Sequence, residues 1–405
     1  MRGLASKVMR RADELARFSS MEHGICRIYG TPEMRGAMDR VEMWMHEAGM
    51  TTERDAFGSL VGTYGGETDG PPFVLGGHLD SVRDAGRYDG ILGVLSGIAV
   101  VESLSGDGRR LPFPLKVVAF ADEEGVRFRT TLIASRVWSA LPLGDQLSLR
   151  DAAGTTLSEA IRGVGGGPDA LPMEAPKILG FLETHIEQGP VLEAEDLPVG
   201  VVTSIVASKQ AEMALTGMAG HAGTVPMSLR RDALAAASEI VLAVERIARS
   251  VDGMVGTVGE LHVQPGAPNV VPGGSSLTVE VRHPSVGACH DAMRVIQDEA
   301  VRICKRRGIE LAWRDLAGYD STPMDAGLVT VLGEAIAAEG IRVRQLPSGA
   351  GHDAVNIAQI APVAMLFVRC EGGISHNPAE SIMEADVSVA LRVVRGFLER
   401  VAATR

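Results

Sequence analysis

Histidine and carboxylate side chains follow apolar segments that have the pattern of buried strands. The first segment, residues 73–77, leads directly to His78, and Asp80 stands two residues further on. Asp89 comes after a loop rich in Asp and Gly, which favours a turn back toward His78. Because open α/β sheets place their sites at the carboxyl ends of strands, we expect one imidazole and two carboxylates to converge there.

Three later segments end in the same way. Each places acids or an imidazole at or just beyond its end: 115–121 with Glu123 and Glu124, 178–186 with His185, and 363–368 with His376. The donors are nitrogen and oxygen atoms, a set that suits zinc, manganese or cobalt. The sequence therefore predicts a metal site with five candidate ligands: His78, Asp89, Glu124, His185 and His376.

Two divalent cations held about 3.5–4 Å apart need a bridging carboxylate, and Asp89 is the natural bridge. Glu123, next to a ligand, is the candidate base, because a divalent cation lowers the pKa of water to about 7 and a nearby carboxylate can then hold its proton. The alternative for each histidine alone is a satisfied core position, and for the two glutamates a solvated surface. Their joint placement at four strand ends favours the metal site.

Overall composition excludes several classes of partner. At 405 residues, 45% of them hydrophobic, the chain is expected to form two domains. A formal net charge of -12 and the lack of a basic run argue against nucleic acid or an anionic membrane as partner. The charged N-terminal segment and four scattered cysteines predict a cytoplasmic protein without a thiolate metal site.

The order of predicted elements indicates an α/β fold with a smaller domain inserted in it. Helical spacing, for example at 93–104, alternates with the strands described above. Residues 141–177 are rich in Gly and Pro and are expected to form a surface excursion with little chemistry. Further on, the pattern changes to strand, helix, two strands, helix and strand. We therefore expect a discontinuous metal-binding domain, 1–210 and 323–405, around an inserted α+β domain, 211–322.

Short motifs in the chain carry a resemblance to a known family. They are Gly-Gly-His78-Leu-Asp80, Asp89-Gly90, Asp-Glu123-Glu124-Gly, His185-Ile-Glu-Gln188-Gly-Pro, Gly-His221-Ala-Gly-Thr-Val-Pro-Met and Ser-His376-Asn-Pro-Ala-Glu. They resemble motifs of the dinuclear M20 metallopeptidase superfamily. More narrowly, they look like its ureido-amide branch: N-carbamoyl-L-amino-acid hydrolases, β-ureidopropionases, allantoate amidohydrolases and ureidoglycolate amidohydrolases. The resemblance covers nearly the whole chain.

The resemblance implies a mixed-sheet, three-layer catalytic domain and a ferredoxin-like inserted domain that serves as a lid and in dimerisation. It implies two divalent ions per subunit, zinc or manganese, with cobalt or nickel as further options. Asp80 is expected to orient His78. The expected division of ligands is one ion shared by His78, Asp89 and His376 or their neighbours, with Glu124 and His185 completing the pair.

The resemblance also implies a substrate pocket that the inserted domain closes, often with residues of the partner subunit in a homodimer. His221 is expected to polarise the scissile carbonyl, Asn269 to add a polar contact, and Arg282 to clamp a substrate carboxylate through its planar guanidinium. Further substrate contacts are expected from Gln188, Gln210 and Gly351. The implied reaction cleaves a carbamoyl or ureido C–N bond of allantoate or an N-carbamoyl-L-amino acid and releases ammonia and CO2.

One departure leaves the substrate open. Where the family has Gly-Gln-x-Arg, this chain has Ala207-Ser208-Lys209-Gln210, which removes two expected donors, whereas the loop at 84–90 looks closest to allantoate amidohydrolases. Two other functions remain as alternatives: an M20-type dipeptidase or N-acyl-L-amino-acid deacylase, and a non-catalytic binding protein on the same scaffold. Gln188 argues against the first, and an intact Glu123 argues against the second.

Overall fold

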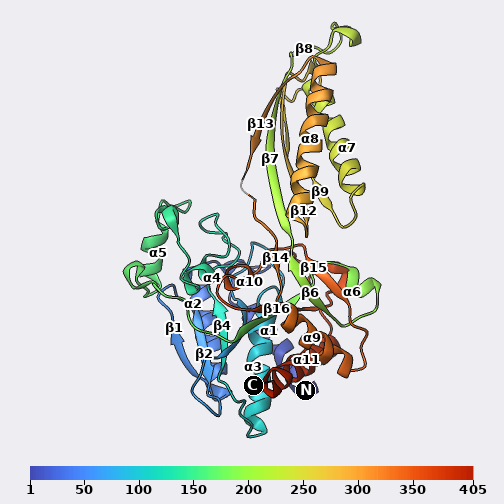
Figure 1. Ribbon diagram of the computed structural model, residues 1–405. Coiled ribbons are helices and arrows are strands. Elements are labelled where there is room, and N and C mark those ends of the chain that lie inside the picture. Colours follow the sequence, from blue (N-terminus) through green and yellow to red (C-terminus); the bar gives the residue numbers. More distant parts are fainter. Residues whose placement is uncertain (317, 405) are drawn as a thin grey trace. The chain divides into compact units, whose positions relative to one another are not determined.

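The computed structural model describes residues 1–316 and 318–404 and divides the chain into two compact units (Figure 1). Unit 1 consists of Met1–Thr203 and Pro323–Arg405, and unit 2 is Ser204–Thr322. The expected first boundary, between residues 210 and 211, falls inside strand β7 (Ala207–Thr216), which pairs along its whole length with β12 (Gly274–His283). Because this ladder of hydrogen bonds belongs to one sheet, unit 2 begins before β7.

A mixed sheet forms the centre of unit 1. Its strands follow the order β1-β2-β4-β3-β5-β16-β6, and β15 pairs with β6. Neighbours among β4, β3, β5 and β16 run parallel, whereas β2 with β4 and β16 with β6 are antiparallel pairs. The strand bounds are β1 Thr51–Arg54, β2 Leu60–Tyr64, β3 Phe73–His78, β4 Leu115–Phe120, β5 Gly180–Ile186, β6 Val199–Ile205, β14 Thr322–Pro323, β15 Gln345–Ser348 and β16 Val363–Val368.

Helices cover the central strands of unit 1. The helices α1, α3, α9 and α11 form one packed group, while α10 contacts α4, β5 and β16. Every residue of β3, β5 and β16 is buried, as expected for parallel strands with both faces covered. The helix bounds are α1 Arg2–Leu15, α2 Pro32–Glu47, α3 Ile91–Gly106, α4 Ile133–Trp138, α5 Leu157–Gly163, α6 Val191–Ala194, α9 Ala326–Ala338, α10 Ala354–Ile357 and α11 Glu384–Ala403.

Helix α3 follows the Asp89 loop directly and is apolar on all sides. Residues 91–101 are buried without interruption, which is typical of a helix enclosed by other elements. Its first turn lies close to the end of β3, since a Cβ atom at Gly93 would be 2.2 Å from the carbonyl oxygen of Gly76. This contact fixes the start of α3, and with it the position of Asp89.

The Gly- and Pro-rich excursion at 141–177 contains the 3-10 helices η1 (Gly144–Ser148) and η2 (Pro168–Ala170) in addition to α5. Helix α5 begins at a capping box in which Thr156 and Glu159 each accept a hydrogen bond from the other's backbone N–H. The sequence did not predict α4, because six residues are too few to show a helical period. Among the helices described, none combines the length and apolar character that a membrane span needs.

Unit 2 is an antiparallel sheet covered by helices α7 and α8. The strand order is β10-β12-β7-β13, and β9 pairs with β12. Along β12, Leu277, Val279 and Val281 are buried in the core shared with the helices, so Glu280 and Arg282 lie on the opposite face. The remaining bounds are β8 Gly220–His221, η3 Met227–Leu229, α7 Ala233–Arg249, β9 Val255–Thr257, β10 Leu261–Gln264, β11 Val270–Val271, α8 Val286–Arg307, β13 Glu310–Asp315 and, in unit 1, η4 Glu371–Gly373.

Candidate metal centre

The candidate ligands meet at the carboxyl edge of the parallel strands. His78, the last residue of β3, pairs with Phe120, the last residue of β4, and Glu123 lies just beyond. His185 on β5 pairs with Phe367 near the end of β16. The sheet topology therefore brings to one edge side chains that lie far apart in the sequence.

Asp89 lies at the centre of this cluster. Its Oδ1 atom is 3.1 Å from Nε2 of His185 and 3.4 Å from Nε2 of His78. Its Oδ2 atom is 3.2 Å from Nε2 of His376. The two oxygens thus face different imidazoles, which is the arrangement that a bridging carboxylate needs.

Among the residues that the structure describes, donor atoms within 4.8 Å of one another form three groups. Two share Asp89, one with His78 and His185 and the other with Glu124 and His376, and the third joins His78, Glu123 and Glu124. This grouping differs from the expected division of ligands, which placed His376 beside His78. His185 joins His78 because β5 is the neighbour of β3 in the sheet, whereas Nε2 of His376 lies 3.5 Å from Oε1 of Glu124.

Asp80 holds the backbone that carries Glu123 and Glu124. Its Oδ1 atom accepts a hydrogen bond from the N–H of Glu123 at 3.0 Å, and its Oδ2 atom accepts one from the N–H of Glu124 at 3.0 Å. Oδ1 also lies 3.5 Å from Nδ1 of His78. Asp80 therefore positions two acids as well as the histidine that the sequence analysis assigned to it.

The imidazoles of His78 and His185 turn the same nitrogen toward Asp89. Nδ1 of His185 is 2.9 Å from the carbonyl oxygen of Ile186, and Nδ1 of His78 is 3.1 Å from that of Asp80. Each carbonyl can accept an Nδ1–H, and each Nε2 faces the cluster. Histidines that bind metals show this arrangement, with the second ring nitrogen donating to a carbonyl or carboxylate.

Gly90 allows the Asp89 loop to lie against both rings. Its φ is 69°, and a Cβ atom there would be 2.3 Å from the ring of His78. Its N–H lies 3.2 Å from Nε2 of His185. A side chain would be strained by the backbone and blocked by the ring, so only glycine fits here.

Glu380 and Ser375 fix the same loop from the C-terminal side. Glu380 is 3% exposed, and its Oε1 atom accepts hydrogen bonds from the N–H groups of Tyr88 at 2.7 Å and Asp89 at 3.2 Å. Ser375 Oγ donates to Oδ2 of Asp89 at 2.9 Å. The sequence analysis missed both roles, although Glu380 stands at the end of the motif that contains His376.

Burial and mutual charge shift the pKa values in the cluster. Burial disfavours the charged form of Asp89, yet hydrogen bonds with His185, His376 and His78 hold its pKa well below the ordinary value. Burial raises the pKa of Glu124 to about 7. Burial, reinforced by the charge of Glu124, also raises the pKa of Glu123 well above its ordinary value. The cluster therefore contains buried negative charge that its imidazoles do not fully compensate.

These residues fit a pair of divalent cations. Buried carboxylates are costly unless they are paired, hydrogen-bonded or bound to a metal, and Asp89, Glu123 and Glu124 crowd together at one edge. The donors are imidazole nitrogens and carboxylate oxygens, which zinc and manganese accept. The chain thus offers two ligand groups with a shared carboxylate and supporting hydrogen bonds.

Gln188, expected to contact substrate, lies within the cluster. Its Nε2 atom donates to Oδ2 of Asp89 at 2.9 Å and to Ser375 Oγ at 3.2 Å. Within the described part of the chain, its Oε1 atom is buried and has no hydrogen-bond partner. The amide nitrogen of Gln188 therefore supports Asp89, a role that the sequence analysis did not predict. The amide oxygen is left for a further contact.

Gly351 and His352 lie on the loop after β15 and belong to unit 1, as the ligand cluster does. A Cβ atom at Gly351 would meet nothing closer than Cδ1 of Leu132, at 3.9 Å, so there is space beside this backbone. His352 is buried, its ring centroid is 4.5 Å from that of His185, and its Nε2 atom is 2.7 Å from Ser348 Oγ. Burial, with the nearby charge of His185, holds the pKa of His352 well below its ordinary value, so a neutral ring packs against this ligand.

In unit 2, His221 and Asn269 lie side by side on the ribbon formed by β8 and β11. His221 pairs with Val270, and the N–H of Ala222 donates to the carbonyl oxygen of Asn269 at 2.9 Å. His221 is exposed, and its Nδ1 atom accepts a hydrogen bond from the N–H of Gly223 at 3.0 Å. Its Nε2 atom is consequently the one that can donate to another molecule.

Gln210 and Arg282 lie in another part of unit 2. Oε1 of Glu280 is 2.9 Å from Nε2 of Gln210 and 3.0 Å from Nη2 of Arg282. From Gln210 to Thr216, the end of β7, the strand spans about 20 Å at the usual rise per residue. The ribbon with β8 lies beyond that end (Figure 1). Unit 2 by itself therefore does not bring these two residues to His221 and Asn269.

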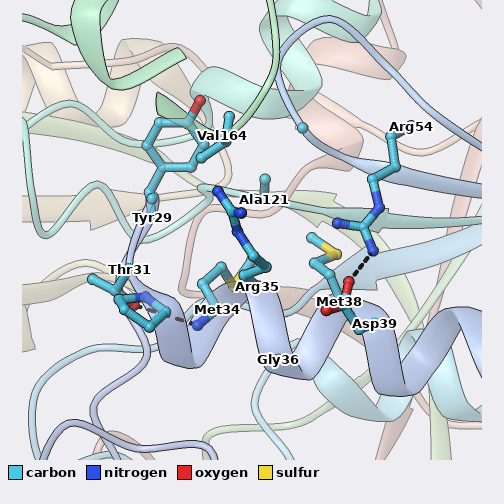
Figure 2. A pocket seen from close by; sticks show the side chains of 13 residues that line it. Tyr29, Thr31, Met34, Arg35, Gly36, Met38, Asp39, Arg54, Ala121 and Val164 are labelled. Atoms are coloured by element: carbon cyan, nitrogen blue, oxygen red, sulfur yellow. Dashed lines mark hydrogen bonds and ion pairs between the residues drawn. The ribbon is translucent and has the colours of Figure 1, made fainter. Parts of the chain in front are cut away.

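A pocket of about 390 Å³ lies beside α2, away from the cluster (Figure 2). Met34, Met38 and Val164 supply apolar walls, and Arg54 pairs with Asp39 at 2.6 Å. None of the candidate metal ligands lines this pocket. The pocket beside α2 is therefore separate from the ligand cluster.

The fold and the cluster together define a class of protein: a two-unit α/β protein with metal-ligand chemistry at the carboxyl edge of its sheet. The family model described as peptidase family M20/M25/M40 matches residues 74–400, and the chain belongs to this family. This confirms the resemblance seen in the motifs.

Individual relatives are amidohydrolases and deiminases. The chain is 40% identical to the N-carbamoyl-L-amino acid amidohydrolase of Geobacillus stearothermophilus, with 92% of each chain covered. It is 36% identical to the probable allantoate deiminase of Oryza sativa subsp. japonica, over 98% of this chain and 88% of that protein. A solved amidase of the hydantoinase/carbamoylase family from Burkholderia multivorans matches with a TM-score of 0.93 and 35% identity, covering 98% of both chains. The chain is therefore a hydrolase of this kind, and the predicted mixed α/β class is confirmed.

Proposed function

We propose that this chain is a dinuclear metal-dependent amidohydrolase that cleaves the carbamoyl or ureido C–N bond of a small carboxylate. The substrate would be allantoate or an N-carbamoyl-L-amino acid, and each turnover would consume one water and release ammonia, CO2 and the remaining amine. The observation that carries the proposal is Asp89, shared by two groups of metal-type donors. The activities named for the relatives support the type of bond.

The residues around Asp89 would hold zinc or manganese. His78, Asp89 and His185 would bind one cation, and Asp89, Glu124 and His376 the other. When bound, the two cations polarise the scissile carbonyl and acidify the attacking water. The hydrogen bonds from Asp80 and Glu380 keep the two halves of this ligand set in place.

Glu123 would carry the proton from the attacking water to the leaving nitrogen. It is 8% exposed, and its Oε2 atom is 4.0 Å from Nε2 of His78, outside the two groups that share Asp89. Its backbone is fixed by Asp80. A carboxylate that is near the reaction but not itself part of the bridged ligand groups can exchange a proton in both steps.

Residues of unit 2 would recognise the substrate. His221, through its outward Nε2, would polarise the carbonyl, with Asn269 beside it as a second polar contact. Arg282 would bind the substrate carboxylate, supported by Glu280 and Gln210. In unit 1, Oε1 of Gln188 and the backbone at Gly351 would contact the ureido group.

An ammonia-release screen tests this function. The protein is loaded with manganese or zinc and offered allantoate, ureidoglycolate, N-carbamoyl-β-alanine and several N-carbamoyl-L-amino acids. We expect at least one substrate to yield ammonia and CO2 in equal amounts, and the Glu123→Gln variant, prepared in the same way, to yield neither. Metal-loaded protein that is inert toward the whole panel would point instead to a non-catalytic binding protein.

The second candidate is an M20-type dipeptidase or N-acyl-L-amino-acid deacylase, because the matching family model is that of a peptidase family. The same preparation is therefore also assayed with dipeptides and N-acetyl-L-amino acids for the appearance of new amino groups. Faster cleavage of these substrates, without ammonia, would favour this candidate. Ammonia release from ureido substrates alone would exclude it.

We also propose a cytoplasmic homodimer in which unit 2 acts as a lid and dimerisation domain. The four cysteines, all buried and outside any disulfide, are consistent with a reducing compartment. If His221 serves the site of the partner, mixing inactive Glu123→Gln and His221→Ala subunits restores one intact site per mixed dimer, which is about one quarter of wild-type activity after random exchange. A mixture that reaches equilibrium without any recovery would mean that His221 acts within its own subunit.

A further inference from the structure

A second pocket in unit 1, of about 760 Å³, has four arginines among its lining residues. Arg83, Arg127, Arg129 and Arg150 contribute guanidinium groups, and Asp151 is the single acid among the lining residues. The chain as a whole has a net charge of -12, so this local excess of positive charge runs against the average. A concave surface with one sign of charge concentrates ions of the opposite sign.

One side of this pocket is rigid. Arg127 donates from Nε to Oδ2 of Asp151 at 2.9 Å and from Nη1 to the carbonyl oxygen of Tyr29 at 3.0 Å, and its guanidinium lies 5.2 Å from the ring centre of Phe128. Oδ1 of Asp151 accepts two further hydrogen bonds from backbone N–H groups. Asp151 is thus fully occupied and compensates Arg127 only.

The other side carries uncompensated charge. Within residues 1–316 and 318–404, the guanidinium groups of Arg83 and Arg129 have no hydrogen bond or ion pair. Arg129 also has a left-handed backbone, with φ of 55°, and its N–H is held by the carbonyl oxygen of Gly125 at 2.8 Å. An L-residue in this conformation is strained, and such strain is typical of side chains placed for a function.

The pocket beside α2, drawn in Figure 2, provides an internal comparison. Thr31 lines both pockets. There Arg54 is paired with Asp39 and Glu42, and Arg35 donates to the carbonyl oxygen of Gly163 at 3.0 Å. Each of these arginines has a partner within the protein. In the second pocket Arg127 pairs with Asp151 and Arg150 donates to the carbonyl oxygen of Gly154. The exposed Arg83 and Arg129, by contrast, have no such partner among the described residues and can bind an anion.

We propose that this arginine pocket binds a small dianion with clustered oxygens, of the phosphate or dicarboxylate type. Planar guanidinium groups bind such oxygens in pairs, and Arg127 would present its remaining donors beside the two unpaired arginines. Arg83 lies on the loop between Asp80 and Asp89, and Arg127 follows Glu124 closely in sequence. An anion here would therefore join the two loops that carry candidate metal ligands. This inference does not depend on the proposed reaction.

Calorimetric titration of the metal-loaded protein with inorganic phosphate and, separately, with succinate tests the proposal. We expect saturable binding of at least one anion, and binding at least tenfold weaker in the double variant Arg83→Gln, Arg129→Gly. Glycine at 129 removes the charge and suits the positive φ, so the fold should persist, as circular dichroism would verify. The matched control is Arg87→Gln, which removes an arginine of the same loop that does not line the pocket. It should bind as the wild type does.

Anions can also bind to cations at a metal centre, so a second variant separates the two sites. Asp89→Asn should retain anion binding if the arginine pocket is responsible. Loss of binding in Asp89→Asn with full binding in the double arginine variant would overturn the proposal, as would the absence of saturable binding for both anions. A preference for phosphate or for succinate identifies which source of the dianion the pocket selects.

Discussion

The metal-ligand cluster of unit 1 and the predicted substrate residues of unit 2 differ in burial and in how close their members lie to one another. In unit 1, Asp89 contacts three imidazoles, and the supporting residues Asp80 and Glu380 are themselves buried. In unit 2, His221 is exposed on a two-stranded ribbon, and Arg282 lies about 26 Å along β12 from the end of the strand near that ribbon. One set is assembled by its own unit, and the other is not.

This difference teaches which properties each set can control. Side chains that are locked together before any ligand arrives can select and orient cations without reorganisation. Unit 2 keeps His221 and Arg282 apart. These residues can therefore act on one substrate molecule only through contacts that unit 2 itself does not supply. We therefore expect substitutions in the cluster to change metal content, and substitutions in unit 2 to change steady-state kinetics while metal content stays the same.

The largest effect should come from Asp89→Asn. This change removes the negative charge shared by both ligand groups and leaves His78, His185 and His376 without their common partner. We expect kcat/KM to fall by more than about 10⁴-fold, beyond the roughly 10²–10⁴-fold that one acid–base residue contributes. Metal analysis after gel filtration should show both ions lost or greatly reduced. Full metal occupancy in this variant would contradict the bridging role.

Glu123→Gln should separate chemistry from metal binding. The glutamine keeps the size of the side chain but cannot hold a proton, so kcat should fall by about 10³-fold. Metal content should remain that of the wild type, because Glu123 lies outside the two groups that share Asp89. Glu67→Gln, which changes an exposed acid of the same unit, is the control and should keep both kcat and metal content. Wild-type kcat in Glu123→Gln would remove Glu123 from the reaction.

The parts of the site that the sequence predicted are those that sheet topology dictates. Parallel strands end at one edge, so acids and imidazoles placed at strand ends come together without any knowledge of side-chain packing. His78 and His185 illustrate this, because both belong to strands whose apolar runs are plain in the sequence. The family resemblance added the expectation of two metal ions at this cluster. The α/β fold class was predicted from the order of strands and helices along the chain.

What the sequence could not predict depends on distances between segments. The partition of ligands around Asp89 follows from β5 being the neighbour of β3, which no local pattern states. Likewise, the hydrogen bond from Gln188 to Asp89 and the support from Glu380 arise from loops that meet only in the folded chain. The sequence placed a boundary near residue 211 because regular alternation begins there, whereas β7 starts at Ala207 and unit 2 at Ser204.

Arg282→Lys tests the other half of the comparison. A lysine keeps the charge but loses the two-pronged contact with a carboxylate, so KM should rise by about 10–100-fold, as for loss of a charged hydrogen bond. Metal content and kcat should change little. Arg314→Lys is the matched control, because Arg314 is also paired with an acid in unit 2, Glu212, but is not a predicted substrate contact. Unchanged kinetics for every carboxylate substrate would exclude Arg282 from recognition.

The smallest effect is expected from Glu380→Gln, which probes how far the cluster depends on its support. The glutamine oxygen can still accept the hydrogen bonds from Tyr88 and Asp89, but the amide loses the charge and the second acceptor oxygen, which faces Ser375. Such supporting residues affect metal affinity by about tenfold or somewhat more. Titration with manganese should show a correspondingly weaker Kd, with kcat at saturating metal close to wild type. Glu371→Gln, an exposed acid of η4, should leave Kd unchanged. Equal affinities for the two variants would mean that the Asp89 loop keeps its position without Glu380, and that the cluster is less dependent on its surroundings than its hydrogen bonds indicate.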